Sequence, residues 1–270
     1  MTPIDFIIFI GVGCAVGFLA GFFGVGGGIL MVPVLVFSYE GSGVSSSVLT
    51  HIAFGTSLFA IIFASFTSAY QHGKQGNIDW RSVWMLGIFS AATALATTKL
   101  AAWLSGKQLR VVFGVLVMAA AIKMLTESEA QAQKKLELLS RPSILGLIGV
   151  GLAAGVVASL AGVGGGIVTI PMMYYLLNMP LKLAIGTSSA TIVITALFSV
   201  VGYILNGMGR TDLPEWSLGF VDLQRGAALA IGTILIARVG AYVSFRTHPF
   251  RLKKIFAFFI ILVSIYMLVK

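Results

Sequence analysis

The sequence predicts an all-α integral membrane protein made of two homologous repeats that are inverted relative to each other. Of its 270 residues, 58% are hydrophobic and only 10% are charged, so a water-soluble fold would lack the polar surface that solvent requires. A polar connector at 127–142 separates two halves of similar length, and the run Gly-Val-Gly-Gly-Gly occurs once in each half. We therefore expect a first membrane repeat at 1–126 and a second at 143–270.

Each repeat contains four apolar blocks, and the first block of each is too long for one helix. The eight blocks span Pro3–Tyr39, Ser47–Gln71, Asp79–Leu104, Leu109–Leu125, Ser143–Leu177, Leu183–Leu205, Asp222–Phe245 and Leu252–Val269. A membrane-spanning helix needs about 20 apolar residues, and blocks one and five far exceed that length. Each repeat is thus expected to have one long, interrupted block followed by three transmembrane helices.

The interruption is a glycine run that a helix cannot easily hold. The segment 17–33 aligns without a gap on 155–171, and nine of the seventeen positions are identical. Glycine inside a helix costs about 1 kcal/mol relative to alanine, so each run predicts a broken helix. The block is either a re-entrant hairpin or two full crossings, and in both cases its two ends emerge on one side of the membrane.

Positive charge separates by face when blocks one and five are treated in this way. Ten Lys and Arg residues then lie on one face and five on the other, whereas single crossings give eight against seven. The first face carries Lys74, Arg81, Lys134, Lys135, Arg141, Lys182, Arg246, Arg251, Lys253 and Lys254, and the second carries Lys107, Arg110, Arg210, Arg225 and Lys270. Because Lys and Arg are enriched in cytoplasmic loops, both termini are expected outside the cytoplasm. An odd number of crossings in each half makes the repeats inverted, as in many secondary transporters.

Two further elements are shared by the halves. Ala-Phe-Gly-Thr-Ser at 53–57 matches Ala-Ile-Gly-Thr-Ser at 184–188, and Gly76–Asp79 aligns with Gly219–Asp222. Both aspartates precede apolar helices, where a carboxylate accepts hydrogen bonds from the first free amides. We interpret them as helix N-caps rather than catalytic groups.

The charges inside the apolar blocks favour an anionic solute. Apart from Asp79 and Asp222, which begin their blocks, Asp5 is the single acidic residue within a block. By contrast, His51, Lys99 and Arg238 lie inside blocks, and a cation carrier usually places a carboxylate at membrane depth. Each glycine run precedes a half-helix, so amides near 26–30 and 164–168 are expected to be unpaired donors at a positive dipole end. The substrate-binding residues expected are Gly24, Gly26, Gly27, Gly28, Thr56, Ser57, Gly162, Gly164, Gly165, Gly166, Thr187, Ser188 and Arg238.

Each of these residues also has a structural interpretation. Glycines allow membrane helices to pack closely, and Ser and Thr in such helices often bond their own backbone. Arg238 and Lys99 are near enough to block ends to extend toward the interface. His51 is a candidate for proton coupling, or an interfacial residue.

Other functional classes lack the residues that they need. There is no cluster of His, Cys and carboxylate residues for a metal, and no nucleophile stands beside a base at a recognisable spacing. The glycine runs lack the βαβ context of a dinucleotide-binding loop. We expect no enzyme activity, no cofactor and no metal. The net charge of +9 is attributed to cytoplasmic loops rather than to nucleic-acid binding.

The paired glycine runs with Pro33 and Pro171, the paired Gly-Thr-Ser elements and the eight-block length resemble the TauE/SafE sulfite exporter family. The resemblance covers essentially the whole chain. It implies a multi-pass transporter of the bacterial inner membrane that moves sulfite or a related small organosulfur anion.

Together these features predict a secondary transporter that works by alternating access around a midplane anion site. An anion channel and a membrane scaffold subunit without transport activity are the alternatives. The partners expected are a small anionic substrate and the lipid bilayer, with a homodimer left open.

Overall fold

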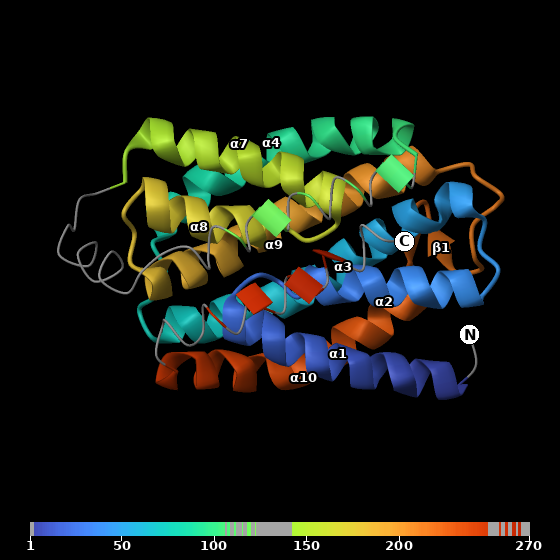
Figure 1. Cartoon of the computed structure of the whole chain (residues 1–270), viewed down its shortest axis with the longest axis horizontal. Coiled ribbons are helices and arrows are strands. Elements are labelled where there is room, and N and C mark those ends of the chain that lie inside the picture. The colour runs from blue at the N-terminus through green and yellow to red at the C-terminus, as the bar shows by residue number, and fades with distance from the viewer. Residues whose placement is uncertain are drawn as a thin grey trace.

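The structure is a computed structural model that describes residues 3–105, 142–247 and isolated positions within 107–122 and 254–265. Apart from those isolated positions, the fourth and eighth apolar blocks and nearly all of the connector therefore lie outside the described residues. The rest is mostly helical (Figure 1). Its helices are α1 (Pro3–Phe23), α2 (Gly28–Gly41), α3 (Ser46–Lys74), α4 (Trp80–Trp103), α7 (Ile144–Ala161), α8 (Gly166–Leu176), α9 (Leu181–Gly207) and α10 (Leu223–Arg246).

Within this part of the chain, six helices are long and apolar enough to cross a membrane, namely α1, α3, α4, α7, α9 and α10. The bounds of α3, α4, α9 and α10 agree with the predicted apolar blocks to within a few residues, and α1 and α7 form the first parts of the long blocks one and five. The prediction of an all-α fold was wrong in one detail. Strands β1 (Ser217–Leu218) and β2 (Val221–Asp222) form a small antiparallel sheet before α10. A turn at Gly219, whose φ is 54°, brings the two strands together, and the polar composition of 210–216 gave no signal for them.

Helix α1 ends at Phe23 and α2 begins at Gly28, while α7 ends at Ala161 and α8 begins at Gly166. The second helix of each pair is short, with 14 residues in α2 and 11 in α8. At 1.5 Å per residue α2 is about 21 Å long, less than the hydrocarbon thickness of a bilayer.

The long helices pack in a single series across the molecule (Figure 1). In order of contact the series is α7, α4, α9, α3, α10 and α1. Helices α3 and α9 lie at its centre, and α2 packs on α3 while α8 packs on α7 and α9. The outer helices α1 and α7 therefore each pack mainly against a helix from the other half of the chain.

Glycine spacing explains how closely α1 approaches α10. Gly13, Gly17 and Gly21 recur every fourth residue and so lie along one face of α1. A Cβ atom added at Gly17 would lie 2.6 Å from the Cα of Thr233, and one added at Gly13 would meet the carbonyl of Leu229. Small residues at this spacing let backbones touch, which is the main source of helix association within a membrane.

This contact predicts that alanine substitution destabilises the protein at one glycine of α1 and not at another. Gly17→Ala should lower the free energy of unfolding by roughly 1–3 kcal/mol, because the added methyl group must separate α1 from α10. Gly11→Ala is the matched control, since no atom of the described residues lies within 4 Å of its Cβ position. Thermal unfolding of the purified proteins in detergent measures both, and equal unfolding temperatures would contradict the predicted contact.

Candidate functional site

The two glycine runs adopt the same backbone conformation. In the first glycine loop, Gly24–Gly28, φ is 68° at Gly24, 79° at Gly26 and 80° at Gly27. In the second glycine loop, Gly162–Gly166, the corresponding angles are 67° at Gly162, 72° at Gly164 and 83° at Gly165. Residues with a Cβ atom rarely adopt these left-handed angles. The repeated motif is thus a requirement of the loop conformation.

The two glycine loops contact each other. A Cβ atom added at Gly28 would lie 2.6 Å from the Cα of Val163, and one added at Gly166 would lie 2.9 Å from the Cα of Val25. Both valines are buried, with exposed fractions of 2% for Val25 and 0% for Val163. The structure thus brings together all eight glycines predicted for the substrate site.

The central helices enclose the loops with isoleucine side chains. Ile61 of α3 and Ile192 of α9 follow the two Gly-Thr-Ser elements at the same distance along the chain. The Cβ position of Gly26 is 2.9 Å from Cγ2 of Ile61, and that of Gly164 is 2.7 Å from Cγ2 of Ile192. Both isoleucines are fully or almost fully buried. In this conformation, apolar side chains cover the loops, and a solute would reach them only if these side chains moved.

Several loop amides lack a backbone acceptor. Within the part of the chain that the structure describes, no backbone carbonyl accepts a hydrogen bond from the amides of 26–28 or of 164–166. The predicted range was too long at its end, because Leu30 N donates to Gly27 O and Val168 N donates to Gly165 O, each at 3.1 Å. The amides without a backbone acceptor therefore include those of the last three glycines of each loop, at the N-terminal ends of α2 and α8.

The threonines of the Gly-Thr-Ser elements bind protein groups from the opposite half. Oγ1 of Thr56 accepts a hydrogen bond from the amide of Asp222 at 2.9 Å, and Oγ1 of Thr187 accepts one from the amide of Asp79 at 3.0 Å. The glycine before each threonine touches the same segments, Gly55 at the carbonyl of Phe220 and Gly186 at that of Asn77. These threonines thus connect the two halves.

The interpretation of both aspartates as N-caps is confirmed. The Asp79 carboxylate accepts the amide of Arg81, and the Asp222 carboxylate accepts the amides of Gln224 and Arg225. Asp222 also accepts hydrogen bonds from the Tyr39 hydroxyl at 3.1 Å and from the Arg225 guanidinium at 2.9 Å.

The serines of the same elements differ from each other. Ser57 donates to the carbonyl of Gly162 at 2.9 Å, which joins α3 to the second glycine loop. Ser188 is fully buried, and its hydroxyl has no hydrogen-bond partner among the described residues.

The structure does not bring Arg238 or His51 to the loops. Arg238 is exposed on α10 and lies over the ring of Tyr70, 5.9 Å from its centroid. His51 precedes Ile61 by ten residues, or about 15 Å along α3. Its Nε2 lies 3.0 Å from the carbonyl of Ala101 and 3.1 Å from that of Leu104, so it donates to the end of α4.

Three serines beside the first glycine loop were absent from the predicted site. Oγ of Ser65 lies 2.9 Å from the Cβ position of Gly26, and Oγ of Ser189 lies 3.2 Å from that of Gly24. Ser68 shares a hydrogen bond of 3.1 Å with Ser189. One signal was present in the sequence, since Ser189 directly follows the Gly-Thr-Ser element of α9.

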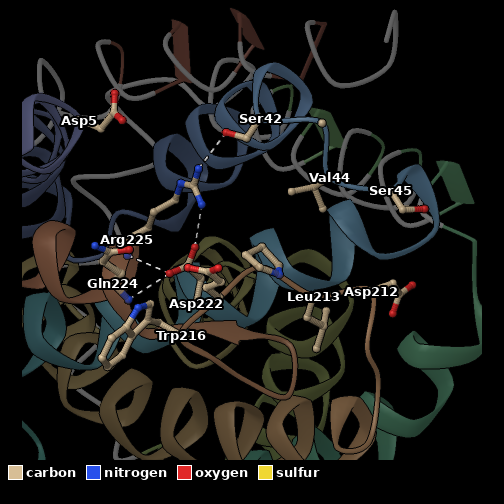
Figure 2. A pocket seen from close by; sticks show the side chains of 13 residues that line it. Asp5, Ser42, Val44, Ser45, Asp212, Leu213, Trp216, Asp222, Gln224 and Arg225 are labelled. Carbon is tan, nitrogen blue, oxygen red and sulfur yellow. Dashed lines mark hydrogen bonds and ion pairs between the residues drawn. The ribbon is translucent and has the colours of Figure 1, made fainter. Parts of the chain in front are cut away.

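A cavity of about 730 Å³ lies elsewhere, at the end of the bundle where α10 begins (Figure 2). The charged residues that line it are Asp5, Asp212, Glu215, Asp222 and Arg225. The Arg225 guanidinium donates to Asp222 and to the Ser42 hydroxyl, each at 2.9 Å. Outside the cavity wall, the Arg210 guanidinium donates to Asp212 and lowers the pKa of that carboxyl. The excess of carboxylates makes this cavity unsuited to holding an anion.

Comparison with known proteins gives one family. A family model described as sulfite exporter TauE/SafE matches residues 9–267. A probable membrane transporter protein of Haemophilus influenzae is 32% identical over 265 residues, covering 96% of each chain. A probable membrane transporter protein of Methanocaldococcus jannaschii is 29% identical, covering 90% of this chain and 87% of its own length. No solved structure matches the chain.

The threonine contacts predict a loss of stability. Thr56→Val should lower the free energy of unfolding by about 1–3 kcal/mol, because the buried amide of Asp222 loses its acceptor. Thr56→Ser keeps the acceptor and should be close to wild type. Thr67→Val is the control, because the Thr67 hydroxyl donates to the carbonyl of Phe63 in its own helix. Chemical or thermal unfolding in detergent measures the three, and a Thr56→Val protein as stable as Thr67→Val would refute the contact.

Proposed function

The chain belongs to the TauE/SafE sulfite exporter family, and from this premise we propose that it is a secondary transporter of the inner membrane. Its substrate is sulfite or a related small organosulfur anion, which it exports by alternating access. The observation that carries the proposal is the contact between two glycine loops in which the amides of 26–28 and 164–166 have no backbone acceptor among the described residues.

The order of helix contacts supports two inverted repeats, 1–126 and 143–270. Exchanging each described helix for its counterpart converts α7–α4–α9–α3–α10–α1 into the same series read backwards. The bonds from Asp222 to Thr56 and from Asp79 to Thr187 exchange in the same way. Such a pseudo-two-fold relation is typical of transporters whose site lies at the repeat interface.

The chemistry of the loops suits an anion. Unpaired amides at the N-terminal end of a half-helix present donors at the positive end of its dipole. Glycine allows an oxygen atom to approach these amides closely, and the loops are buried, so the hydrogen bonds replace lost hydration in a medium of low dielectric. A sulfite or sulfonate group has several oxygen atoms that accept such bonds.

Alternating access requires two sides to the site, and the contacts of α3 supply them. Both glycine loops touch Ile61 of α3. The first also touches Ser65, toward the C-terminal end of the helix, and the second also touches Phe54, toward its N-terminal end. Rocking of one repeat against the other would uncover one loop at a time. An inside-negative potential favours export by about 2.3 kcal/mol per charge per 100 mV.

The charges at the two ends of the bundle support an orientation. Lys74, Arg81 and Lys182 lie at the end where α3 finishes and α9 begins, and Arg246 is in the last turn of α10 at that end. The opposite end carries the carboxylates of the cavity. By the positive-inside rule, the basic end faces the cytoplasm.

Two exposed glycines test this orientation. Gly76 follows α3 at the basic end and Gly209 follows α9 at the other end, and both have open space around their Cβ positions. In a Cys14→Ser background, a membrane-impermeant thiol reagent should label Gly209→Cys in intact cells and Gly76→Cys only after permeabilisation. The reverse pattern would overturn the orientation.

Transport itself is tested in liposomes. Gly27→Val and Gly165→Val should abolish sulfite flux, because valine at a φ near 80° distorts the loop and its side chain meets Val16 or the Ala154 carbonyl. Gly76→Val is the matched control, with a φ of 70° and, in the part of the chain that the structure describes, no neighbour within 4 Å of its Cβ position.

Membrane insertion and size-exclusion profiles show whether each variant is folded. Wild-type flux from folded Gly27→Val and Gly165→Val proteins would reject the loops as the site. Saturable flux that is accelerated by substrate on the opposite side distinguishes a carrier from a channel. Absence of flux and of stabilisation by sulfite, sulfate, thiosulfate and sulfonates would favour a scaffold.

A further inference from the structure

We propose that the two glycine loops have different roles and that the first one coordinates the anion, together with the hydroxyl groups of Ser65, Ser68 and Ser189. The second loop then serves as an apolar closing surface. This inference rests on the proposed function and specifies which side of the site recognises the oxyanion group of the substrate.

Ser65 carries the argument. Its side chain is fully buried, and its hydroxyl has no hydrogen-bond partner among the described residues. Its oxygen lies 2.9 Å from the Cβ position of Gly26, so it points at the first glycine loop beside amides that also lack an acceptor. A buried hydroxyl without a partner is costly. The Ser65 hydroxyl and the neighbouring unpaired amides together form a group of hydrogen-bond donors with no acceptor. An oxyanion is the acceptor that this set lacks.

The other two serines complete the set from the neighbouring helix and the next turn. Ser189 of α9 is almost fully buried and donates to Ile185 of its own helix, with the carbonyl of Gly24 at 3.5 Å. Ser68 of α3 is bonded to Ser189 at 3.1 Å. These hydroxyls can rotate toward a bound oxygen, since a hydroxyl proton adopts the direction that its acceptor requires.

The second glycine loop lacks counterparts of Ser65 and Ser189. In the alignment of the Gly-Thr-Ser helices, Ser65 corresponds to Ala196 and Ser189 corresponds to Leu58. Cγ of Phe54 lies 2.8 Å from the Cβ position of Gly162. The hydroxyl of Ser57 is already used, because it donates to the Gly162 carbonyl. The two loops thus share a backbone conformation and differ in their surroundings.

The first glycine loop, with its serines, lies toward the basic end of the bundle. Ser65 follows Ile61 in the direction of Lys74, and Ser189 precedes Ile192 in the direction of Lys182. An anion arriving from that end meets the serines before the isoleucines. Ile61, Ile185 and Ile192 provide an apolar wall near the same loop, against which a short carbon substituent of a sulfonate could pack while its oxygens face the serines.

The test compares Ser65→Ala and Ser189→Ala with a control, Ser199→Ala. In the alignment of the Gly-Thr-Ser helices, Ser199 of α9 corresponds to Ser68 of α3. Ser199 donates to Thr195 of its own helix and contacts Ser159. Thermal-shift titration with sulfite should show that Ser65→Ala weakens binding about tenfold or more, the loss expected for one hydrogen bond to a charged group. Ser199→Ala should stay within about threefold of wild type. Without sulfite, Ser65→Ala should unfold at the wild-type temperature or above, because the hydroxyl that it loses has no partner among the described residues.

The outcomes separate this inference from the proposed function. If wild-type protein is neither stabilised by the anion panel nor active in liposomes, the proposed function fails. If wild-type protein binds sulfite, and the Ser65→Ala and Ser189→Ala variants bind it as tightly as wild type does, the function stands and the role of the serines is overturned. A loss in Ser199→Ala equal to that in Ser65→Ala would overturn the difference between the loops. A lower unfolding temperature for Ser65→Ala without sulfite would assign Ser65 a structural role instead.

Discussion

The contact between two stretches of non-helical backbone in the protein interior is the constraint that the rest of the structure satisfies. Peptide groups outside a helix are costly away from water unless they are bonded. The chain nevertheless buries two such loops against each other, and among the described residues no backbone carbonyl accepts from the amides of 26–28 or 164–166. Helices α3 and α9 pack against each other and supply the isoleucines that cover the loops. The other long helices then pack outward from this central pair.

The halves of the chain are joined by contacts that neither half could form alone. Helix α3 contacts the segment before α10, and α9 contacts the segment before α4. In each case a threonine hydroxyl accepts a hydrogen bond from that segment, and the preceding glycine lets the segment approach the helix. The outer helices α1 and α7 are likewise covered by α10 and α4. The Gly-Thr-Ser motif is therefore repeated for at least one reason unrelated to a ligand, and its threonines are better understood as connectors.

The sequence predicted the helices well and the contacts between them only in part. Apolar length and the glycine runs located the six long helices and the start of α2 and α8, because composition and backbone freedom are local properties. Repetition led to all eight loop glycines. Thr56 and Thr187 were assigned to the substrate because a hydroxyl in an apolar helix looks alike whether it faces a solute or a distant amide. Ser65 was absent from the predicted site, and Arg238 was included although the structure does not bring it to the loops. The reason is the same, since the face of a helix that a side chain occupies depends on packing across the whole chain.

The close seam between α1 and α10 has a consequence for how the protein is made. About 200 residues separate the end of α1 from the start of α10, and ribosomes add roughly 5–20 residues per second. For about 10–40 s after its synthesis, the glycine face of α1 has lipid or another protein as its neighbour instead of its final partner. Helix α1 thus reaches its main native contact long after it is synthesised, and until then its glycine face is open to other small-residue helices in the membrane.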